Sequence, residues 1–304
     1  MKKTKIIYYL FPFHLDLFER SLYQLKKASY YSNTKEYLAI DVVLDLSDFN
    51  FNWGKCKIPK EFFIDKFRYL EKYCDFCKEI NFEINNEMRG SGEQQRRIYN
   101  NNNKEYNIIL LDPDIYFPIE ILHIFDQVIP QIEKKYSTYV LTPQVGKFWD
   151  SSWDILSNDS YLKSNIKFDE IDVFELSLRS DIDNISLLKN YNHKFGGGWF
   201  TYYSAELTEL MKVPESIGYF HHFDLYQQEK FKILNQFNYN IPQFIIKNCI
   251  IQEDRKYSQE YNYLTKYIPL EPPTKSNSEL SKEIYDNVVK ELNILYQNER
   301  KANP

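Results

Sequence analysis

Two aspartates separated by one proline, Asp112 and Asp114, follow a run of four apolar residues at 108–111. A short continuous apolar run predicts a strand that is buried on both faces of a sheet. In a parallel α/β sheet, ligands bind at the edge formed by the carboxyl ends of the strands. Carboxylate oxygens suit Mg²⁺ and Mn²⁺, so the pair predicts a divalent-cation site shared with a diphosphate. The alternative is that Asp112 ends a turn and Asp114 is solvated.

Three of the chain's eight glycines are adjacent at 196–198, and Trp199 and Phe200 follow them. Such use of a scarce residue indicates backbone that takes unusual dihedral angles or approaches a ligand closely. The two aromatic residues favour the edge of a pocket on which a sugar ring stacks. A plain flexible turn is the alternative.

A third group of candidate residues consists of His221, His222 and Asp224, which precede a predicted helix at 225–238. Asp224 as the N-cap, with Gln227 three positions later, predicts a capping box. A carboxylate at this position also suits a general base, and the two histidines add groups that titrate near neutral pH.

The segments around these motifs alternate between strand and helix patterns. Apolar runs predict strands at 5–11, 37–46, 81–84, 108–111, 138–141 and 243–251. Helical spacing predicts helices at 15–30, 60–80, 118–135, 204–212 and 225–238. This alternation indicates an α/β fold with a mainly parallel sheet and helices on both faces. Residues 143–190, which contain Trp149-Asp150 and Trp153-Asp154, are less regular.

The chain's 304 residues suffice for one large domain with an extension. We expect a domain at 1–268, then a linker and a C-terminal amphipathic helix at 269–304 that packs on it. A net charge of −5 argues against a general duplex-DNA binder. No apolar run approaches the roughly 18 residues of a transmembrane helix, and no signal-peptide cleavage site follows the N-terminal apolar run, so we expect a cytoplasmic protein.

Cys74 and Cys77 have the spacing of a zinc or redox pair, but no second pair lies nearby. Both fall on the apolar stripe of the predicted helix at 60–80. We therefore interpret them as core residues.

The chain resembles a GT-A fold glycosyltransferase, most like the inverting family-two type, over roughly residues 4–255. The resemblance rests on the order of four features along the chain: the alternating strands and helices, the Asp-Pro-Asp motif, the glycine run and Asp224. The resemblance implies a single GT-A domain with a mixed, mostly parallel sheet and a C-terminal helical extension. It implies metal-dependent transfer of a sugar from a UDP- or GDP-linked donor to a carbohydrate or other hydroxyl acceptor.

The resemblance also implies roles for individual residues. The nucleotide base and ribose would lie at Phe11, Pro12 and the cluster of Asp45, Ser47 and Asp48, and the segment holding Gly92, Gln95 and Arg97 would contact the nucleotide. Asp112 and Asp114 would hold Mn²⁺ or Mg²⁺ against the two phosphates. Gly197, Gly198 and Trp199 would border the donor sugar and the acceptor, and Asp224 or His222 would remove the acceptor proton.

The chain departs from that family at three places. The family's second-strand signature is usually richer in glycine than residues 45–48 of this chain. The family has Glu-Asp where this chain has His221-His222. Many relatives also have a late metal-binding histidine, which has no counterpart in residues 250–258. Asp254, a water or one of the two histidines would take its place. A catalytically silent nucleotide- or carbohydrate-binding relative therefore stays open as an alternative. A sugar-1-phosphate nucleotidyltransferase is disfavoured, because residues 10–14 lack the glycine-rich loop and arginine of that class.

Overall fold

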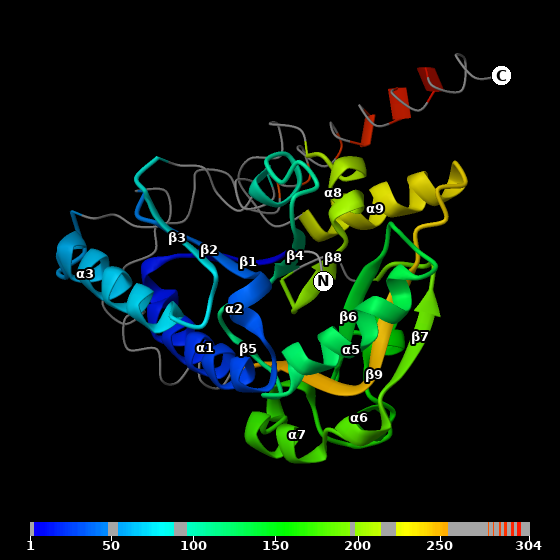
Figure 1. The fold of residues 1–304 in the computed structure, drawn as a ribbon, viewed down its shortest axis with the longest axis horizontal. Helices are drawn as coiled ribbons and strands as arrows, with labels where there is room; N and C mark the ends of the chain where they lie inside the picture. The colour runs from blue at the N-terminus through cyan, green and yellow to red at the C-terminus, as the bar shows by residue number, and fades with distance from the viewer. Residues whose placement is uncertain are drawn as a thin grey trace.

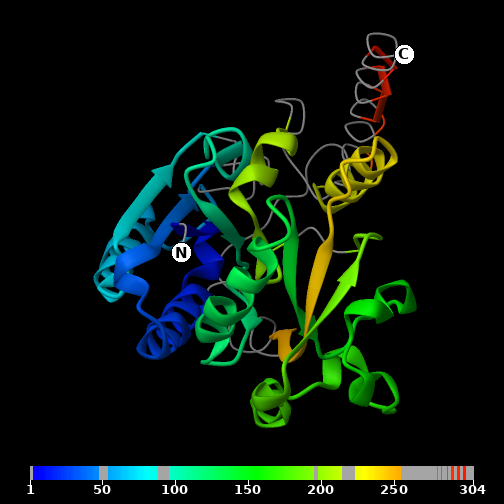
Figure 2. The same ribbon diagram turned by 45° about the vertical axis from the view of Figure 1, so that its right-hand side comes forward.

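The computed structural model describes residues 3–47, 54–87, 96–194, 198–213 and 223–254, with isolated helical positions between 279 and 298. These residues form a nine-stranded mixed sheet with helices on both faces. Helices α8 and α9 cover one face of the sheet and α1 and α5 the other, as can be followed in Figures 1 and 2. The prediction of an α/β domain is confirmed.

The strands follow the order β3-β2-β1-β4-β8-β6-β9-β5, and β7 pairs with β9. Strands β1, β2, β3 and β4 are parallel to one another, and β6 is parallel to β9. Strand β8 is antiparallel to both β4 and β6, so β6 runs in the same direction as β4. These strands span Thr4–Leu10 (β1), Leu38–Asp45 (β2), Glu79–Asn85 (β3), Asn107–Leu110 (β4), Val140–Val145 (β6) and Gln243–Glu253 (β9). The antiparallel strands are Ile115–Tyr116 (β5), Ser186–Asn190 (β7) and Thr201–Tyr203 (β8).

The larger core lies between the sheet and helices α1 (Leu15–Ala28), α3 (Lys60–Glu71) and α5 (Ile121–Glu133). A second core lies on the opposite face, against α8 (Ala205–Leu210) and α9 (Phe223–Gln236). Strand β1 supplies both cores, because alternate side chains of a strand point to opposite faces. The short helices are α2 (Thr34–Tyr37), α6 (Asp159–Leu162) and α7 (Val173–Arg179).

The predicted strands and helices are present within the described residues, with shifted ends. The helix predicted at 60–80 is too long: α3 ends at Glu71, a short 3-10 helix covers 72–74, and β3 begins at Glu79. Cys74 is buried and free, which confirms it as a core residue, and burial raises the pKa of its thiol to about 12. Cys77 is half-buried beside the core.

Strands β5, β7 and β8 were not predicted, because β5 and β8 have only two and three residues and β7 is mostly exposed or half-buried. The predicted packing of the C-terminal helix at 269–304 falls outside the described residues. No helix in the described parts of the chain is long and apolar enough to cross a bilayer.

Candidate functional site at the carboxyl edge of the sheet

The carboxyl ends of β1, β2 and β4 bring three predicted site residues to one edge of the sheet. Leu10 pairs with Leu44 in the register of β1 and β2, which places Phe11 beside Asp45. Ile7 pairs with Leu110, so the chain beyond β4 reaches Asp112 at the same edge. We call this edge the carboxyl edge. It is where ligands bind to open α/β sheets.

The Asp-Pro-Asp motif and the glycine run meet because β8 is antiparallel to β4. Leu110 pairs with Thr201, so residues that precede β8 lie beside residues that follow β4. The backbone N–H of Asp112 donates to the carbonyl oxygen of Gly198 over 2.7 Å. A β-carbon added to Gly198 would lie 2.1 Å from Oδ1 of Asp112. Only glycine therefore fits here while this carboxylate keeps its position.

The backbone at Phe200 is strained. Its φ angle is 57°, in the left-handed region that bulky residues avoid. The side chain is fully buried, with its ring centroid 4.9 Å from Phe117 and 5.5 Å from Phe125, and its N–H donates to Gly198 over 3.0 Å. Such strain costs about 1–3 kcal/mol and is concentrated at ligand sites. Here it turns the chain so that Gly198 and Trp199 stand at the carboxyl edge.

Asp114 lies beside the end of β9. Strand β5 pairs with β9 through Ile115 and Glu253, and the N–H of Asp254 donates to the carbonyl oxygen of Asp114 over 2.7 Å. The carboxylate of Asp254 is buried and accepts a hydrogen bond from the guanidinium of Arg20. Asp254 is therefore close to the motif, but its carboxylate is engaged by a cation in this state.

A divalent cation fits the donor set of Asp112 and Asp114 only with help from other ligands. The described residues contain no group of three or more histidine, cysteine or acidic side chains that could hold a metal. Two carboxylates are nevertheless the usual protein contribution to a Mg²⁺ site that is completed by phosphate oxygens and water. The pair thus suits a cation that arrives with a diphosphate.

Beside the motif, Asp45 is 1% exposed and forms part of a buried polar group. The hydroxyl of Tyr9 donates to its Oδ2 over 2.5 Å, and the N–H of Ser47 donates to its Oδ1 over 2.8 Å. The ring of Phe11 lies next to this group, with its centroid 5.7 Å from that of Tyr9. Pro12 is buried and opens a short 3-10 helix.

Arg97 is bound to carboxylates on the sheet. It lies in a helical turn at 96–99, where its guanidinium is 3.3 Å from Asp41 and also pairs with Glu83. Asp41 is on the same face of β2 as Asp45, since the two are four residues apart along the strand. Contact between Arg97 and a diphosphate would require these pairs to open.

Several predicted residues cannot be placed. Gln95, Gly197 and His222 fall outside the described residues, and so does the side chain of Asp224. Helix α9 begins at Phe223, so Asp224 is in its first turn and is not its N-cap. The predicted capping box is wrong, because the buried amide of Gln227 accepts from the hydroxyl of Tyr203 over 3.0 Å and donates to the hydroxyl of Tyr99.

The predicted site omitted Tyr9 and most of an aromatic cluster around Trp199. Trp199 is surrounded by Phe148, Trp149 and Phe168. The sequence signal that could have pointed to this cluster is the repeated Trp-Asp pair at 149–150 and 153–154. Their convergence depends on tertiary folding, because Trp199 is far from the others in the chain. No protein-family model matches this chain, and no curated protein matches it in sequence.

Proposed function

We propose that this protein is a metal-dependent glycosyltransferase of the GT-A type. It moves a sugar from a UDP- or GDP-linked donor to a hydroxyl acceptor in a single inverting displacement. The observation that carries the proposal is the contact between Asp112 and Gly198 at the carboxyl edge. This contact joins a candidate cation site to a glycine loop, with a buried polar group on one side and aromatic rings on the other.

The donor would lie along the carboxyl edge from β2 to β4. The buried group of Tyr9, Asp45 and Ser47 supports recognition of the nucleoside, because a fixed carboxylate accepts hydrogen bonds from ribose hydroxyls or base N–H groups. Asp112 and Asp114 would hold the cation, which supplies positive charge to the leaving diphosphate. Glycine at 198 keeps the backbone close to that charge without a side chain in the way.

The displacement forms a bond between the acceptor oxygen and the anomeric carbon as the bond from that carbon to the diphosphate breaks. The acceptor proton passes to a general base, which we assign to Asp224 or His222. Gln228, one turn after Asp224 on α9, donates to the carbonyl oxygen of Lys194 over 2.9 Å. Helix α9 is thus anchored to the segment that leads into the glycine run, which supports a base from its first turns.

The proposal is tested by a thermal-shift panel of UDP, GDP, CDP and dTDP with and without Mn²⁺. UDP or GDP is expected to raise Tm only when Mn²⁺ is present; a ligand at about 100 times its Kd stabilises by about 2.7 kcal/mol. Asp112→Asn and Asp114→Asn should abolish this shift and turnover, while Asp65→Asn on the exposed side of α3 keeps both. Full activity of both variants with saturating Mn²⁺ would refute the assignment.

A catalytically silent relative is the second candidate, because His221-His222 replaces the Glu-Asp pair of the family. Hydrolysis of the donor separates the two. A transferase releases sugar slowly to water in the presence of Mn²⁺, whereas a silent relative binds the nucleotide and releases none.

A further inference from the structure

Trp199 lies at the centre of a cluster of aromatic rings. Its centroid is 4.9 Å from that of Phe148 and 6.5 Å from that of Phe168, both nearly parallel to it, and 6.2 Å from that of Trp149. Trp153 stacks on Phe148, with the two ring centroids 5.2 Å apart. The cluster contains three of the chain's four tryptophans.

Trp149 is the exposed member of this cluster. Its surface is 59% exposed, whereas Phe148 and Phe168 are buried and Trp199 is half-buried. The edge-on contact between Trp149 and Phe168, at 5.3 Å, fixes the position of the indole. A flat, exposed and rigidly supported indole is the kind of surface that stacks against the C–H face of a sugar ring.

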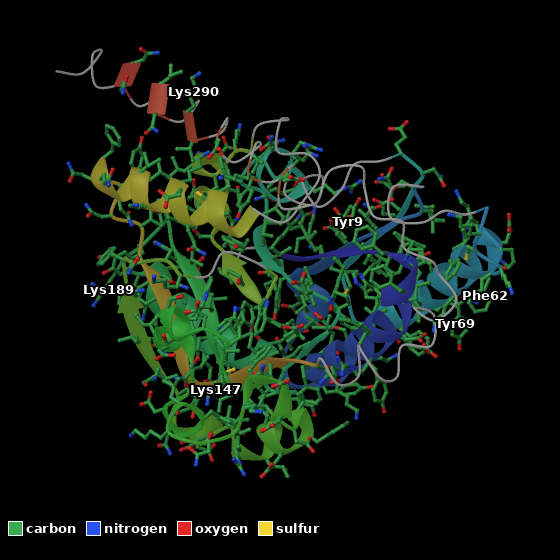
Figure 3. The ribbon with its side chains drawn as sticks, turned by 180° about the vertical axis from the view of Figure 1, so that it is seen from behind. Tyr9, Phe62, Tyr69, Lys147, Lys189 and Lys290 are labelled. Atoms are coloured by element: carbon green, nitrogen blue, oxygen red, sulfur yellow. The ribbon has the colours of Figure 1, made fainter. Side chains whose placement is uncertain are left out.

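The cluster lies on the opposite side of Asp112 from the buried polar group at Asp45. In the sheet, β1 and β2 are on one side of β4, and β8 and β6 are on the other. Phe148 and Trp149 follow β6, and Trp199 precedes β8. In Figure 3, Tyr9 on β1 and Lys147, which follows β6, lie well apart. The aromatic rings therefore lie next to the candidate cation site, on the side away from Asp45. The proposed nucleotide would occupy the Asp45 side and leave the side with the rings open.

Lys147 holds the segment that carries the rings. Its ammonium donates to the carbonyl oxygens of Ser164 over 3.2 Å and Ile166 over 2.8 Å. These bonds draw the chain before Phe168 against the chain before Trp149. The two rings are therefore positioned before any ligand arrives, which reduces the ordering cost of binding.

The charge of the surrounding segment selects against anionic ligands. Residues 147–175 contain three lysines and seven aspartates or glutamates, a formal net charge of −4. Arg179 and Lys247, from outside this range, pair with Glu175 and Asp159, which leaves a net charge of −2. Next to the exposed indole, Asp150 accepts from the N–H of Ser152 over 2.7 Å, and this bond lowers the pKa of its carboxyl. A phosphate-bearing lipid or a membrane with anionic headgroups would be repelled, whereas sugar hydroxyls can donate to these carboxylates.

We propose that Trp149, supported by its contacts with Phe168 and Trp199, forms the acceptor platform and that the acceptor is a neutral carbohydrate chain. The assignment of the carbohydrate as acceptor rests on the proposed transferase function. The binding of the carbohydrate itself depends only on the aromatic cluster.

Isothermal titration calorimetry on the full chain, without nucleotide or metal, tests the proposal. The probes are maltotriose, cellotriose, chitotriose and mannotriose, with farnesyl phosphate as the lipid probe. At least one trisaccharide is expected to bind. The Trp149→Ala variant is expected to bind that trisaccharide about tenfold more weakly. Trp149→Phe should retain most of the affinity. Tyr30→Ala, which removes an aromatic side chain that is 76% exposed between α1 and α2, should leave it unchanged.

The proposal is overturned if no trisaccharide binds, if Trp149→Ala binds as tightly as the wild type, or if farnesyl phosphate binds through Trp149 instead. Asp112→Asn separates the two proposals, since it should keep trisaccharide binding while losing nucleotide binding. A wild-type chain that binds a trisaccharide through Trp149 but binds no nucleotide would refute the transferase and leave the carbohydrate site standing.

Discussion

The backbone of Gly198 is packed directly against the carboxylate of Asp112. A β-carbon at position 198 would lie 2.1–2.2 Å from all three atoms of that carboxyl group, well inside any contact that real side chains make. The same two residues are joined by a 2.7 Å backbone hydrogen bond, so neither can move away alone. The geometry of Asp112 thus depends on the absence of a side chain at position 198.

We therefore predict that Gly198→Ala displaces the Asp112 carboxylate and weakens Mn²⁺-dependent nucleotide binding by about tenfold or more. The measurement is the thermal-shift titration with UDP or GDP. Gly146→Ala is the matched control, since its β-carbon would lie 2.6 Å from the end of the Gln252 side chain and would not contact Asp112. Equal nucleotide binding by the two alanine variants would contradict the prediction.

Adjacent tyrosines of β1 provide a second test, because their hydroxyls lie on opposite faces of the sheet. Tyr9 donates to Asp45 over 2.5 Å, and Tyr8 is bonded to Ser21 of α1 over 2.7 Å. Each phenylalanine variant should lose about 1–2 kcal/mol of the free energy of unfolding. Only Tyr9→Phe should also weaken nucleotide binding, because only Tyr9 orients the carboxylate assigned to the nucleoside. Weakened binding in Tyr8→Phe alone would place the nucleoside elsewhere.

Asp254 is expected to act as a structural residue and not as a metal ligand. Its carboxylate is paired with Arg20, and both side chains are largely buried. Removal of one partner leaves a buried charge without its compensating ion, which costs about 3–5 kcal/mol. Asp254→Asn should therefore lower the urea midpoint strongly while Mn²⁺ affinity in the presence of UDP or GDP changes little. A selective loss of Mn²⁺ affinity, with the urea midpoint unchanged, would identify Asp254 as a ligand.

Features set by local sequence could be predicted, and features set by long-range pairing could not. The apolar run at 108–111 indicated a buried strand just before Asp112, and the structure has that strand at Asn107–Leu110. Phe11 and Asp45 lie at the ends of two further strands that the sequence predicted. Strand β8 was missed because three residues carry too little periodicity, and its pairing with β4 joins residues far apart in the chain. The contact between Gly198 and Asp112 follows from that pairing.

Side-chain partners were the least predictable part of the site. Gln227 has the spacing of a capping residue, but two buried tyrosine hydroxyls on other elements compete for its amide. Arg97 has the charge to bind a diphosphate, but Asp41 and Glu83 on neighbouring strands lie within its reach. Local spacing does not reveal such competitors, because they approach only when the sheet and helices assemble.

A final prediction concerns the buried ring of His193, which stacks on Phe231 with centroids 4.1 Å apart. Burial lowers its pKa from 6.5 to about 3, because the imidazolium would lose its hydration. The folded chain therefore keeps this histidine neutral while the unfolded chain takes up a proton. The resulting stability is present above pH 6.5 and is lost as the pH falls toward 3.

His193→Phe keeps a flat ring on Phe231 and removes the titration. Between about pH 7 and pH 5, the wild type should lose about 2 kcal/mol more of its free energy of unfolding than this variant does. Urea unfolding at the two pH values measures the difference. Burial also lowers the pKa of His14 to about 3. Because His14 is present in both proteins, its contribution to the pH dependence cancels in the difference between them. His123→Phe, which replaces an exposed histidine on α5, should show the same pH dependence of unfolding as the wild type. Equal pH dependence in all three proteins would show that His193 becomes protonated without unfolding.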